Sequence, residues 1–427
     1  MVKVFMDAYG CVENMVDAGR YRDFLENHGY CFTNDFMEAD VIIFFTCGVT
    51  SYTAKECSMR MKMLSEKKKE NARLLVGGCL PIIEKEKMED GAVFRTSHND
   101  FSALASLLGI ENCDFSSNQF TNSMFLAPDK EEEQEGYAAF KRKMAELAKL
   151  EKQLLMGKSR KEMNQYTYFG RVSEEIYKDA YFVPISRGCG GNCAYCAVKH
   201  VKGDTKSNPV EEILSQISQG YERGYHEIVL SGDDTGSYGK DIDEDFYSLM
   251  KQITELDLPL NYTLRNFEPF WLTNNEERFD ELLSMGRIVN VCIPIQSASK
   301  KVVASMGRNY DPLKILSLID RYKRLYPDIV WSTHMMLGFP GEDDDDYKES
   351  LDCIGDRFDY VKHSMYTDRP NTRSLEYPDK VSAAVKKLRM MEFEKCTQST
   401  LKERYREKVN SLPEELKKTL EKVLNDE

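Results

Sequence analysis

The chain has 427 residues, twelve cysteines and a formal net charge of −13. Its length is sufficient for two or three domains, and its acidity argues against a broad nucleic-acid-binding surface, though not against a local basic patch. No apolar stretch is long enough to cross a bilayer, and the start, Met1–Phe5, reads as a strand and not as a signal peptide. Cysteines in such a chain indicate metal or redox chemistry, so we expect a cytoplasmic protein that does not contact membranes.

The first hundred residues alternate between strand and helix patterns, which is typical of a small domain with an open parallel sheet. Three expected strands each end beside a cysteine: Val2–Tyr9 before Gly10-Cys11, Asp40–Thr46 before Cys47, and Arg73–Gly78 before Cys79. Helices are expected at Ala18–His28, Ala54–Asn71 and Pro81–Glu89. Because ligands of open α/β sheets bind where the carboxyl ends of the strands converge, Cys11, Cys47 and Cys79 are predicted to form one three-thiolate site. The alternative is that each is a small buried hydrophobic residue.

Residues 113–179 have a different character, and we expect an inserted helical linker there. A charge run at Asp129–Glu135 precedes a helical pattern over Tyr137–Lys161, which has one apolar and one basic face. We interpret this helix as lying on a domain surface. Contact of its basic face with an acidic or phosphorylated substrate is the alternative.

From Tyr181 onward the alternation of strands and helices returns. It predicts a partial (βα)6 barrel whose chemistry lies at the carboxyl ends of its strands. The expected domains are therefore 1–112, 180–380 for the barrel, and a helical extension over 381–427. The expected strands are Phe182–Ser186, Glu227–Ser231, Asn261–Leu264, Ile288–Pro294, Ile329–Met336 and Tyr360–Met365, and the expected helices include Pro209–Arg223, Phe246–Leu256, Asp311–Tyr326, Ala383–Arg406 and Leu412–Leu424.

Three further cysteines, Cys189, Cys193 and Cys196, follow the first strand of this barrel with the spacing C-x3-C-x2-C. Three thiolates on one short loop can hold a four-iron cluster and leave one iron open to another ligand. A structural zinc site is the alternative. Such sites have four protein ligands, usually in paired C-x2-C units, and no second pair follows here.

With these residues in view, the chain resembles the radical-SAM methylthiotransferases of the MiaB/RimO type. Gly10-Cys11, Phe45-Thr46-Cys47 and Val76–Pro81 resemble the N-terminal cluster-binding domain of that family, and Ser186–Cys196 resembles its radical-SAM loop. Further motifs follow in the family's order: Leu230–Gly239, Pro294–Ser299, Met306-Gly307-Arg308 and Leu337–Glu342.

The resemblance implies two [4Fe–4S] clusters. The one on Cys189, Cys193 and Cys196 would bind S-adenosylmethionine and generate a 5′-deoxyadenosyl radical that removes a substrate hydrogen. The one on Cys11, Cys47 and Cys79 would carry the sulfur, so that a C–H hydrogen is replaced by a methylthio group. An electron donor such as flavodoxin or ferredoxin is also implied.

The resemblance also suggests residues that bind S-adenosylmethionine. Tyr195 would pack beside the adenine. Asp233 and Gln296, which follow expected strands, would meet its amine, carboxylate or ribose, and Arg265 at another strand end would orient the carboxylate or the substrate. Gly338 and Gly341 would let the backbone approach the adenine. Ordinary core and salt-bridge roles are the alternatives for Tyr195 and Arg265. The run Asp343–Asp346 is interpreted as the solvated start of a helix and not as a metal site, and the remaining cysteines as packed thiols.

Departures from the family's pattern bear on the substrate. The small all-β TRAM module expected near the C-terminus is not recognisable after Asn410, Asn371 and Ala298 stand where glycine is usual, and Lys199 and Lys202 stand where proline and arginine are common. The substitutions put the identity of the substrate in doubt, whereas the unrecognised TRAM module and the acidic charge favour a polypeptide or peptide side chain as substrate. The alternative is a modified adenosine in tRNA, such as threonylcarbamoyladenosine. A non-catalytic metal-binding scaffold is a third hypothesis.

Overall fold

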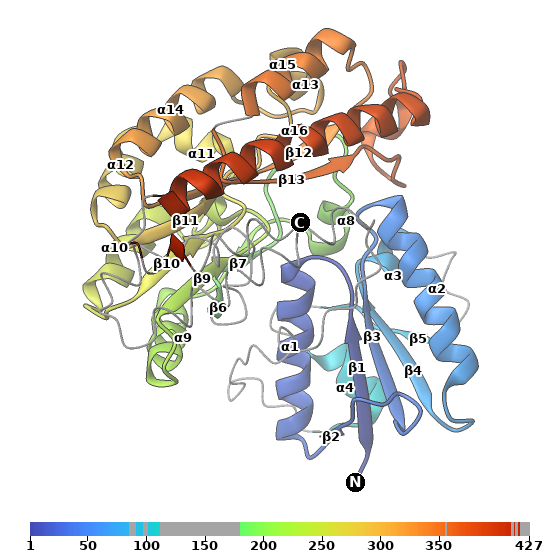
Figure 1. Ribbon diagram of the computed structural model, residues 1–427. Coiled ribbons are helices and arrows are strands. Elements are labelled where there is room, and N and C mark those ends of the chain that lie inside the picture. The colour runs from blue at the N-terminus through green and yellow to red at the C-terminus, as the bar shows by residue number, and fades with distance from the viewer. Residues whose placement is uncertain are drawn as a thin grey trace. The chain divides into compact units, whose positions relative to one another are not determined.

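The computed structural model describes residues 1–84, 91–96, 101–111, 180–354 and 357–410, together with Glu414, Lys417 and Lys418. The chain forms two compact units (Figure 1). The predicted linker and most of the second C-terminal helix lie outside the described residues, and the domain boundaries that we expected stay a prediction. The first unit comprises the described residues of Met1–Ala127, Ser186–Asn208 and Thr367–Tyr377, and the second those of Pro128–Ile185, Pro209–Tyr366 and Pro378–Glu427.

The first unit is built on a five-stranded parallel sheet with the order β2-β1-β3-β4-β5. Helices α1 (Val12–Asn27) and α2 (Ser51–Lys67) cover its two faces (Figure 1). This arrangement confirms the predicted α/β class. The strands are β1 (Lys3–Ala8), β2 (Cys31–Phe32), β3 (Val41–Thr46), β4 (Arg73–Gly78) and β5 (Ala92–Val93), with short helices α3 (Leu80–Ile83) and α4 (Ser102–Leu108).

The central strand β3 shows why this sheet forms. Its six residues are apolar apart from Thr46, and all six are buried. Alternate side chains point to opposite faces: Ile43 and Phe45 pack in the core under α1, while Ile42 and Phe44 pack in the core under α2. A continuous apolar strand is the pattern expected for a parallel sheet that is covered on both sides.

Two segments from far along the chain complete the first unit. The segment Ser186–Asn208 holds strand β7 (Ser186–Arg187), helix α8 (Val198–Lys202) and strand β8 (Lys206–Ser207), and β7 pairs with β8 in antiparallel fashion. The segment Thr367–Tyr377 holds the short helix η5 (Arg373–Glu376). The loop with the second cysteine motif therefore belongs, by its contacts, with the N-terminal sheet.

The second unit is built on six parallel strands in chain order, β13-β12-β11-β10-β9-β6. Helices connect each strand to the next, as in Figure 1, and this is the partial barrel that the sequence predicted. The strands are β6 (Tyr181–Pro184), β9 (Glu227–Ser231), β10 (Asn261–Leu264), β11 (Ile288–Cys292), β12 (Val330–Leu337) and β13 (Tyr360–Met365). The helices are α9 (Val210–Glu222), α10 (Phe246–Glu255), α11 (Pro269–Asn274), α12 (Glu276–Ser284), α13 (Lys300–Ser305), α14 (Pro312–Leu325), α15 (Asp344–Ile354) and α16 (Ala383–Asn410), with the single turn η4 (Thr235–Ser237).

Candidate iron–sulfur sites and their surroundings

The first three cysteines lie at the carboxyl ends of three neighbouring strands. Cys11 directly precedes α1, and Cys47 and Cys79 each come one residue after their strands, β3 and β4. Strands β1, β3 and β4 are adjacent and parallel, so these ends meet at one edge of the sheet. The backbone N–H of Cys79 donates to the carbonyl of Thr46, 2.8 Å away, next to Cys47. The strand ends that carry these cysteines are therefore neighbours, and a shared site on the three thiols stays a prediction.

The surroundings of Cys11 disfavour the charged form of its thiol. Cys47 and Cys79 are buried and Cys11 is half-buried. Burial raises the pKa of the Cys11 thiol well above its usual value; the carboxylate of Glu13 and the thiols of Cys79 and Cys47 also raise it, and the Lys202 ammonium lowers it. The Cys11 thiol is therefore protonated at neutral pH, and binding of a metal there must displace that proton.

A fourth cysteine lies beside this triad. Cys57, on α2, is completely buried, and its sulfur accepts a hydrogen bond from the backbone N–H of Cys47 at 3.2 Å. Burial raises the pKa of Cys57 to about 12. It is thus the packed thiol that we expected, whereas Cys31 is exposed, contrary to that expectation, and Cys113 lies outside the described residues.

The second triad lies on the loop between β7 and α8. Gly191 sits between two of its sulfurs: an ideal β-carbon there would be 3.1 Å from the Sγ of Cys189 and 4.0 Å from that of Cys193. The N–H of Gly191 donates to Cys189 Sγ at 3.2 Å, and that of Cys196 donates to the Cys193 carbonyl at 3.2 Å. All three cysteine residues are half-buried.

Both triads belong to the same unit and share contacts. Cys79 and Ile83 pack in one apolar cluster with Ala197 and Val201 of the second triad's segment. Ala197 directly follows Cys196, so the end of the second triad lies against the third member of the first. The charge of Lys202 on α8 likewise acts on Cys11.

The donor sets fit iron–sulfur clusters better than single metal ions. Within the described ranges, no three His, Cys, Asp or Glu side chains converge on one point in the way that a single bound ion requires. A cubane cluster places each thiolate on a different iron, so its ligands are spaced more widely around it. The lack of a side chain at Gly191, where a β-carbon would lie 3.1 Å from Cys189 Sγ, suits such a group. Cys189, Cys193 and Cys196 would hold one cluster, and Cys11, Cys47 and Cys79 would hold the other.

Four of the six residues predicted to bind S-adenosylmethionine follow neighbouring strands of the second unit. Asp233 comes after β9, Arg265 after β10, Gln296 after β11 and Gly338 after β12, and so all lie at the carboxyl edge of one parallel sheet. Gln296 has a left-handed backbone (φ +62°), held by hydrogen bonds of its N–H to the His334 carbonyl and of its carbonyl to the Met336 N–H. Such strain in a non-glycine residue is typical of functional sites.

Tyr195 and the two glycines differ in their surroundings. Tyr195 is half-buried and belongs to the first unit. Gly338 has φ +75°, but an ideal β-carbon there would lie 2.2 Å from Cγ of Lys386 on α16, so a lysine stem fills that space. Gly341 has φ +83° and no atom within 4 Å of an ideal β-carbon, and its N–H donates to the Asp379 carbonyl at 3.0 Å. Of these two glycines, Gly341 has the open face that close approach of a ligand requires.

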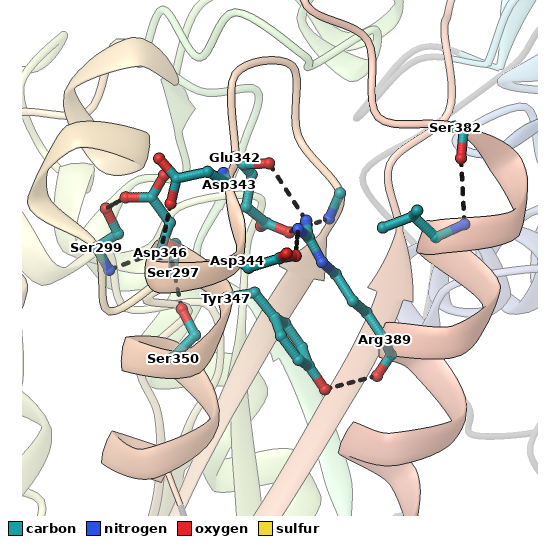
Figure 2. Close-up of polar contacts among 12 residues, drawn as sticks. Ser297, Ser299, Glu342, Asp343, Asp344, Asp346, Tyr347, Ser350, Ser382 and Arg389 are labelled. Atoms are coloured by element: carbon teal, nitrogen blue, oxygen red, sulfur yellow. Dashed lines mark hydrogen bonds and ion pairs between the residues drawn. The ribbon is translucent and has the colours of Figure 1, made fainter.

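The last residue of the motif Leu337–Glu342 has a structural role. Glu342 accepts a hydrogen bond from the Gly338 N–H at 2.8 Å and forms a buried ion pair with Arg389 of α16 at 2.6 Å. Figure 2 shows Arg389 reaching from α16 to both Glu342 and Asp344. Burial raises the pKa of Glu342, against the lowering effects of the Gly338 N–H and Arg389. This carboxylate closes the glycine turn and attaches α16.

The acidic run Asp343–Asp346 starts helix α15, as expected. The carboxylates of Asp343 and Asp346 accept hydrogen bonds from each other's backbone N–H groups, at 3.0 and 2.9 Å. Asp346 departs from the expectation of a solvated residue, since it is buried and accepts a hydrogen bond from the Ser299 hydroxyl at 2.6 Å (Figure 2).

The sequence predicted Asp233 as a residue that binds S-adenosylmethionine, but it did not single out the neighbouring Asp234. Asp234 is buried, and both of its carboxylate oxygens accept from Trp271 Nε1, at 3.1 and 3.0 Å. Burial raises its pKa to about 6, the Trp271 N–H lowers it, and the charge of Glu268 raises it. The pair Asp233-Asp234 in the sequence gives no sign that the second aspartate is buried and accepts from Trp271.

Comparison with known proteins shows what the chain is similar to. Residues 183–354 match the Radical SAM superfamily and residues 3–96 match the Uncharacterized protein family UPF0004. The chain is 26% identical over 407 residues to a tRNA-2-methylthio-N(6)-dimethylallyladenosine synthase of Thermoanaerobacter, covering 90% of this chain and 75% of that protein. It is 27% identical over 384 residues to a Pyrococcus abyssi protein named "Probable threonylcarbamoyladenosine tRNA methylthiotransferase", covering 88% of this chain and 80% of that one.

The chain belongs to the radical-SAM methylthiotransferase family. It is therefore a transferase, and the family uses S-adenosylmethionine and two [4Fe–4S] clusters. Among solved structures, the radical S-adenosylmethionine methyltransferase TsrM from Kitasatospora setae, with cobalamin and a [4Fe-4S] cluster bound, has the same fold. Its TM-score is 0.55 at 12% identity, covering 87% of this chain and 74% of that one. Within the described residues, no helix has the length and apolarity needed to span a bilayer.

Proposed function

We propose that this methylthiotransferase acts on a modified adenosine in tRNA, the alternative substrate of the sequence analysis. The observation that carries the proposal is the basic character of the segment that holds the second triad. Apart from the buried Arg187, Ser186–Asn208 contains three lysines (Lys199, Lys202 and Lys206) and one aspartate, in a chain whose net charge is −13. The names of the relatives from Thermoanaerobacter and Pyrococcus abyssi support a tRNA substrate in the same direction.

Several basic side chains lie beside the thiols. The Lys199 ammonium donates to the Gly191 carbonyl at 3.1 Å, and the Arg373 guanidinium donates to the Asn192 carbonyl. Lys202 is near enough to Cys11 to lower its pKa. Phosphate groups bind where lysine and arginine gather, and this basic surface would hold a polynucleotide backbone next to the reacting centres.

The residues of the chain have a supporting role in the reaction. When bound, the two clusters and S-adenosylmethionine supply the radical, the sulfur and the methyl group. The six cysteines hold the clusters, and Cys47 and Cys79 keep one of them in a buried environment. Asp233, Arg265, Gln296 and Gly341 are proposed to orient S-adenosylmethionine, and Tyr195 to contact its adenine.

The test is an anaerobic assay with the reconstituted enzyme, a one-electron reductant and S-adenosylmethionine. One arm contains tRNA from cells that lack methylthiotransferases, and the other a peptide library. Mass spectrometry of the digested nucleosides should show one hydrogen of an adenosine derivative replaced by a methylthio group. Modification that is confined to peptides would refute the tRNA substrate.

A polypeptide substrate is the second candidate, and the net charge of −13 favours it because a polyanion is repelled by the acidic chain as a whole. The peptide arm of the same assay decides between the two. A flavodoxin or ferredoxin as electron donor, and a cytoplasmic location, complete the proposal.

A further inference from the structure

Two arginines of the first unit are almost completely buried. The side chains of Arg187 and Arg369 are only 8% and 3% exposed. Each belongs to a different segment that returns to this unit from a distant part of the chain. A buried guanidinium is costly unless it is paired, so the partners of these two residues specify where their segments lie.

Arg187 connects the second triad to the helix that follows Cys11. One of its terminal nitrogens is 3.3 Å from the carboxylate of Asp17, which lies on α1 and is itself nearly buried. The other donates to the carbonyl and the hydroxyl of Thr96, at 3.1 and 3.2 Å. Arg187 precedes Cys189 by two residues, and α1 begins directly after Cys11. One side chain thus joins the start of one triad to an element that positions a member of the other.

Arg369 makes a second connection from the opposite direction. It forms an ion pair with Glu84 at 2.5 Å, and Glu84 directly follows α3, the helix that begins after Cys79. A few residues later, Arg373 donates to the Asn192 carbonyl, and the Ser374 N–H donates to the Ala194 carbonyl at 2.9 Å. The segment with Arg369 therefore contacts Glu84 and also holds the loop between Cys189 and Cys196.

We infer that Arg187 and Arg369 are positioning residues that fix the two thiol triads relative to each other. The catalytic consequence rests on the function proposed above, in which a substrate radical formed beside one cluster must meet sulfur on the other. Rates of such steps fall about a hundredfold for a displacement of about one ångström. The two ion pairs fix the position of the triads relative to each other, because each arginine pairs with one defined carboxylate, on α1 or directly after α3. An apolar contact could slide and would not define that position.

The test uses the double variant Arg187→Met/Asp17→Asn, which removes the ion pair without leaving an unpaired buried charge. The exposed pair of Lys3 and Glu38, 2.9 Å apart in the same unit, provides the control Lys3→Met/Glu38→Gln. Three quantities are measured: iron per chain, the magnetic coupling between the two reduced clusters, and the ratio of 5′-deoxyadenosine to methylthiolated product.

We expect the double variant to keep its iron, to show altered and broadened coupling, and to raise the ratio about tenfold, because the radical then forms without meeting sulfur. The control should match the wild type in all three quantities. If the double variant loses iron, Arg187→Lys, which keeps the charge but changes the donation to Thr96, is tested with the same measurements. A variant that holds both clusters with coupling and ratio unchanged would overturn the inference.

Failure of the proposed function gives a different result. A wild-type enzyme that holds two clusters but modifies no tRNA refutes that function, while the coupling measurement still tests the positioning role. A wild-type chain that binds only one cluster overturns the inference, since no second centre is then present.

Discussion

Gly10 lies against Cys47 so closely that an ideal β-carbon on Gly10 would be 2.4 Å from Cβ and 2.8 Å from Sγ of Cys47. The backbone of Gly10 also has φ +115°, a conformation that other residues rarely adopt. The glycine before Cys11 thus brings the first two cysteines of the triad together, and any side chain there would push their sulfurs apart.

Gly10→Ala should therefore lose the cluster on Cys11, Cys47 and Cys79 and keep the other. We expect about four irons per chain where the wild type holds about eight, with cleavage of S-adenosylmethionine retained and methylthio transfer lost. Gly109→Ala is the control, since Gly109 also has positive φ (+71°) but no atom within 4 Å of an ideal β-carbon. Full iron content in Gly10→Ala would contradict the assignment.

The adjacent thiols of Cys47 and Cys57 give a second prediction. Cys47→Ala removes a ligand and should reduce the iron to about four per chain, whereas Cys57→Ala should keep about eight. Removing the buried thiol of Cys57 should lower the free energy of unfolding by about 1 kcal/mol. Iron analysis and urea denaturation of the two variants test this, and loss of iron in Cys57→Ala would show that Cys57 belongs to the ligand set.

Asp234 should give the second unit a pH-dependent stability. Its pKa is raised from 3.8 to about 6, so the native state retains a proton that the unfolded state has lost. Stability therefore falls as the pH rises from about 4 to about 6, by about 3 kcal/mol in all. Asp234→Asn should remove this loss of stability. The free energy of unfolding of the variant, relative to that of the wild type, should therefore be larger at neutral than at acidic pH.

Urea denaturation at several pH values measures the effect of Asp234. Trp271→Phe provides a second check, because it removes the N–H that lowers the pKa of Asp234. In that variant the loss of stability should extend to higher pH. A pH dependence that is identical in the wild type and Asp234→Asn would show that Asp234 titrates normally.

The ion pair of Arg389 and Glu342 should be necessary for attachment of α16. Arg389→Met leaves the Glu342 carboxylate, whose side chain is 2% exposed, without its counter-charge. We expect a loss of about 3 kcal/mol in the free energy of unfolding, measured by urea denaturation. Lys300→Met, which breaks an exposed pair with Asp311 at 2.8 Å, should cost less than about 1 kcal/mol. Equal losses in both variants would contradict a special role for the buried pair.

Asn371 should be replaceable by glycine but not by valine. It has φ +62° and follows Pro370 in a turn in which the Thr372 N–H and hydroxyl both donate to the Arg369 carbonyl. This matches a type II turn, which needs glycine or asparagine at its third position. Asn371→Gly should change stability by less than about 0.5 kcal/mol, and Asn371→Val should cost more than about 1 kcal/mol in thermal or urea unfolding. A tolerated valine would argue against this turn.

Sequence patterns predicted the strands well. Arg73–Gly78, Glu227–Ser231, Asn261–Leu264 and Tyr360–Met365 were expected with the bounds that the structure has, because apolar runs with turn residues at their ends leave little choice. The start of α1 was placed at Ala18 and lies six residues earlier. Its first turns bury polar side chains such as Asn14 and Asp17, which conceals the apolar face. Similarly, α3 ends at Ile83, before the predicted end at Glu89, and residues 85–90 lie outside the described part.

The positions of the six cysteines, after three strands and on one loop, were predictable because strand ends and loop spacing are local signals. The contacts of Arg187 and Arg369 could not be predicted, because their partners Asp17 and Glu84 lie far away in the sequence. A charged residue in a sequence also does not indicate whether its side chain is buried. The same holds for Asp234, whose environment depends on Trp271 from a different connection of the barrel.

The first unit is assembled from three stretches of chain, the last of which ends at Tyr377. During synthesis, the ribosome has released the N-terminal sheet long before it adds Arg369, and until then Glu84 has no arginine to pair with. Since contacts between distant residues form slowly, the surroundings of Cys79 are completed late in folding. Iron delivered to the nascent protein would thus meet Cys11, Cys47 and Cys79 before the contacts of Glu84 have formed. The cluster proposed for these cysteines would therefore be inserted after translation has ended.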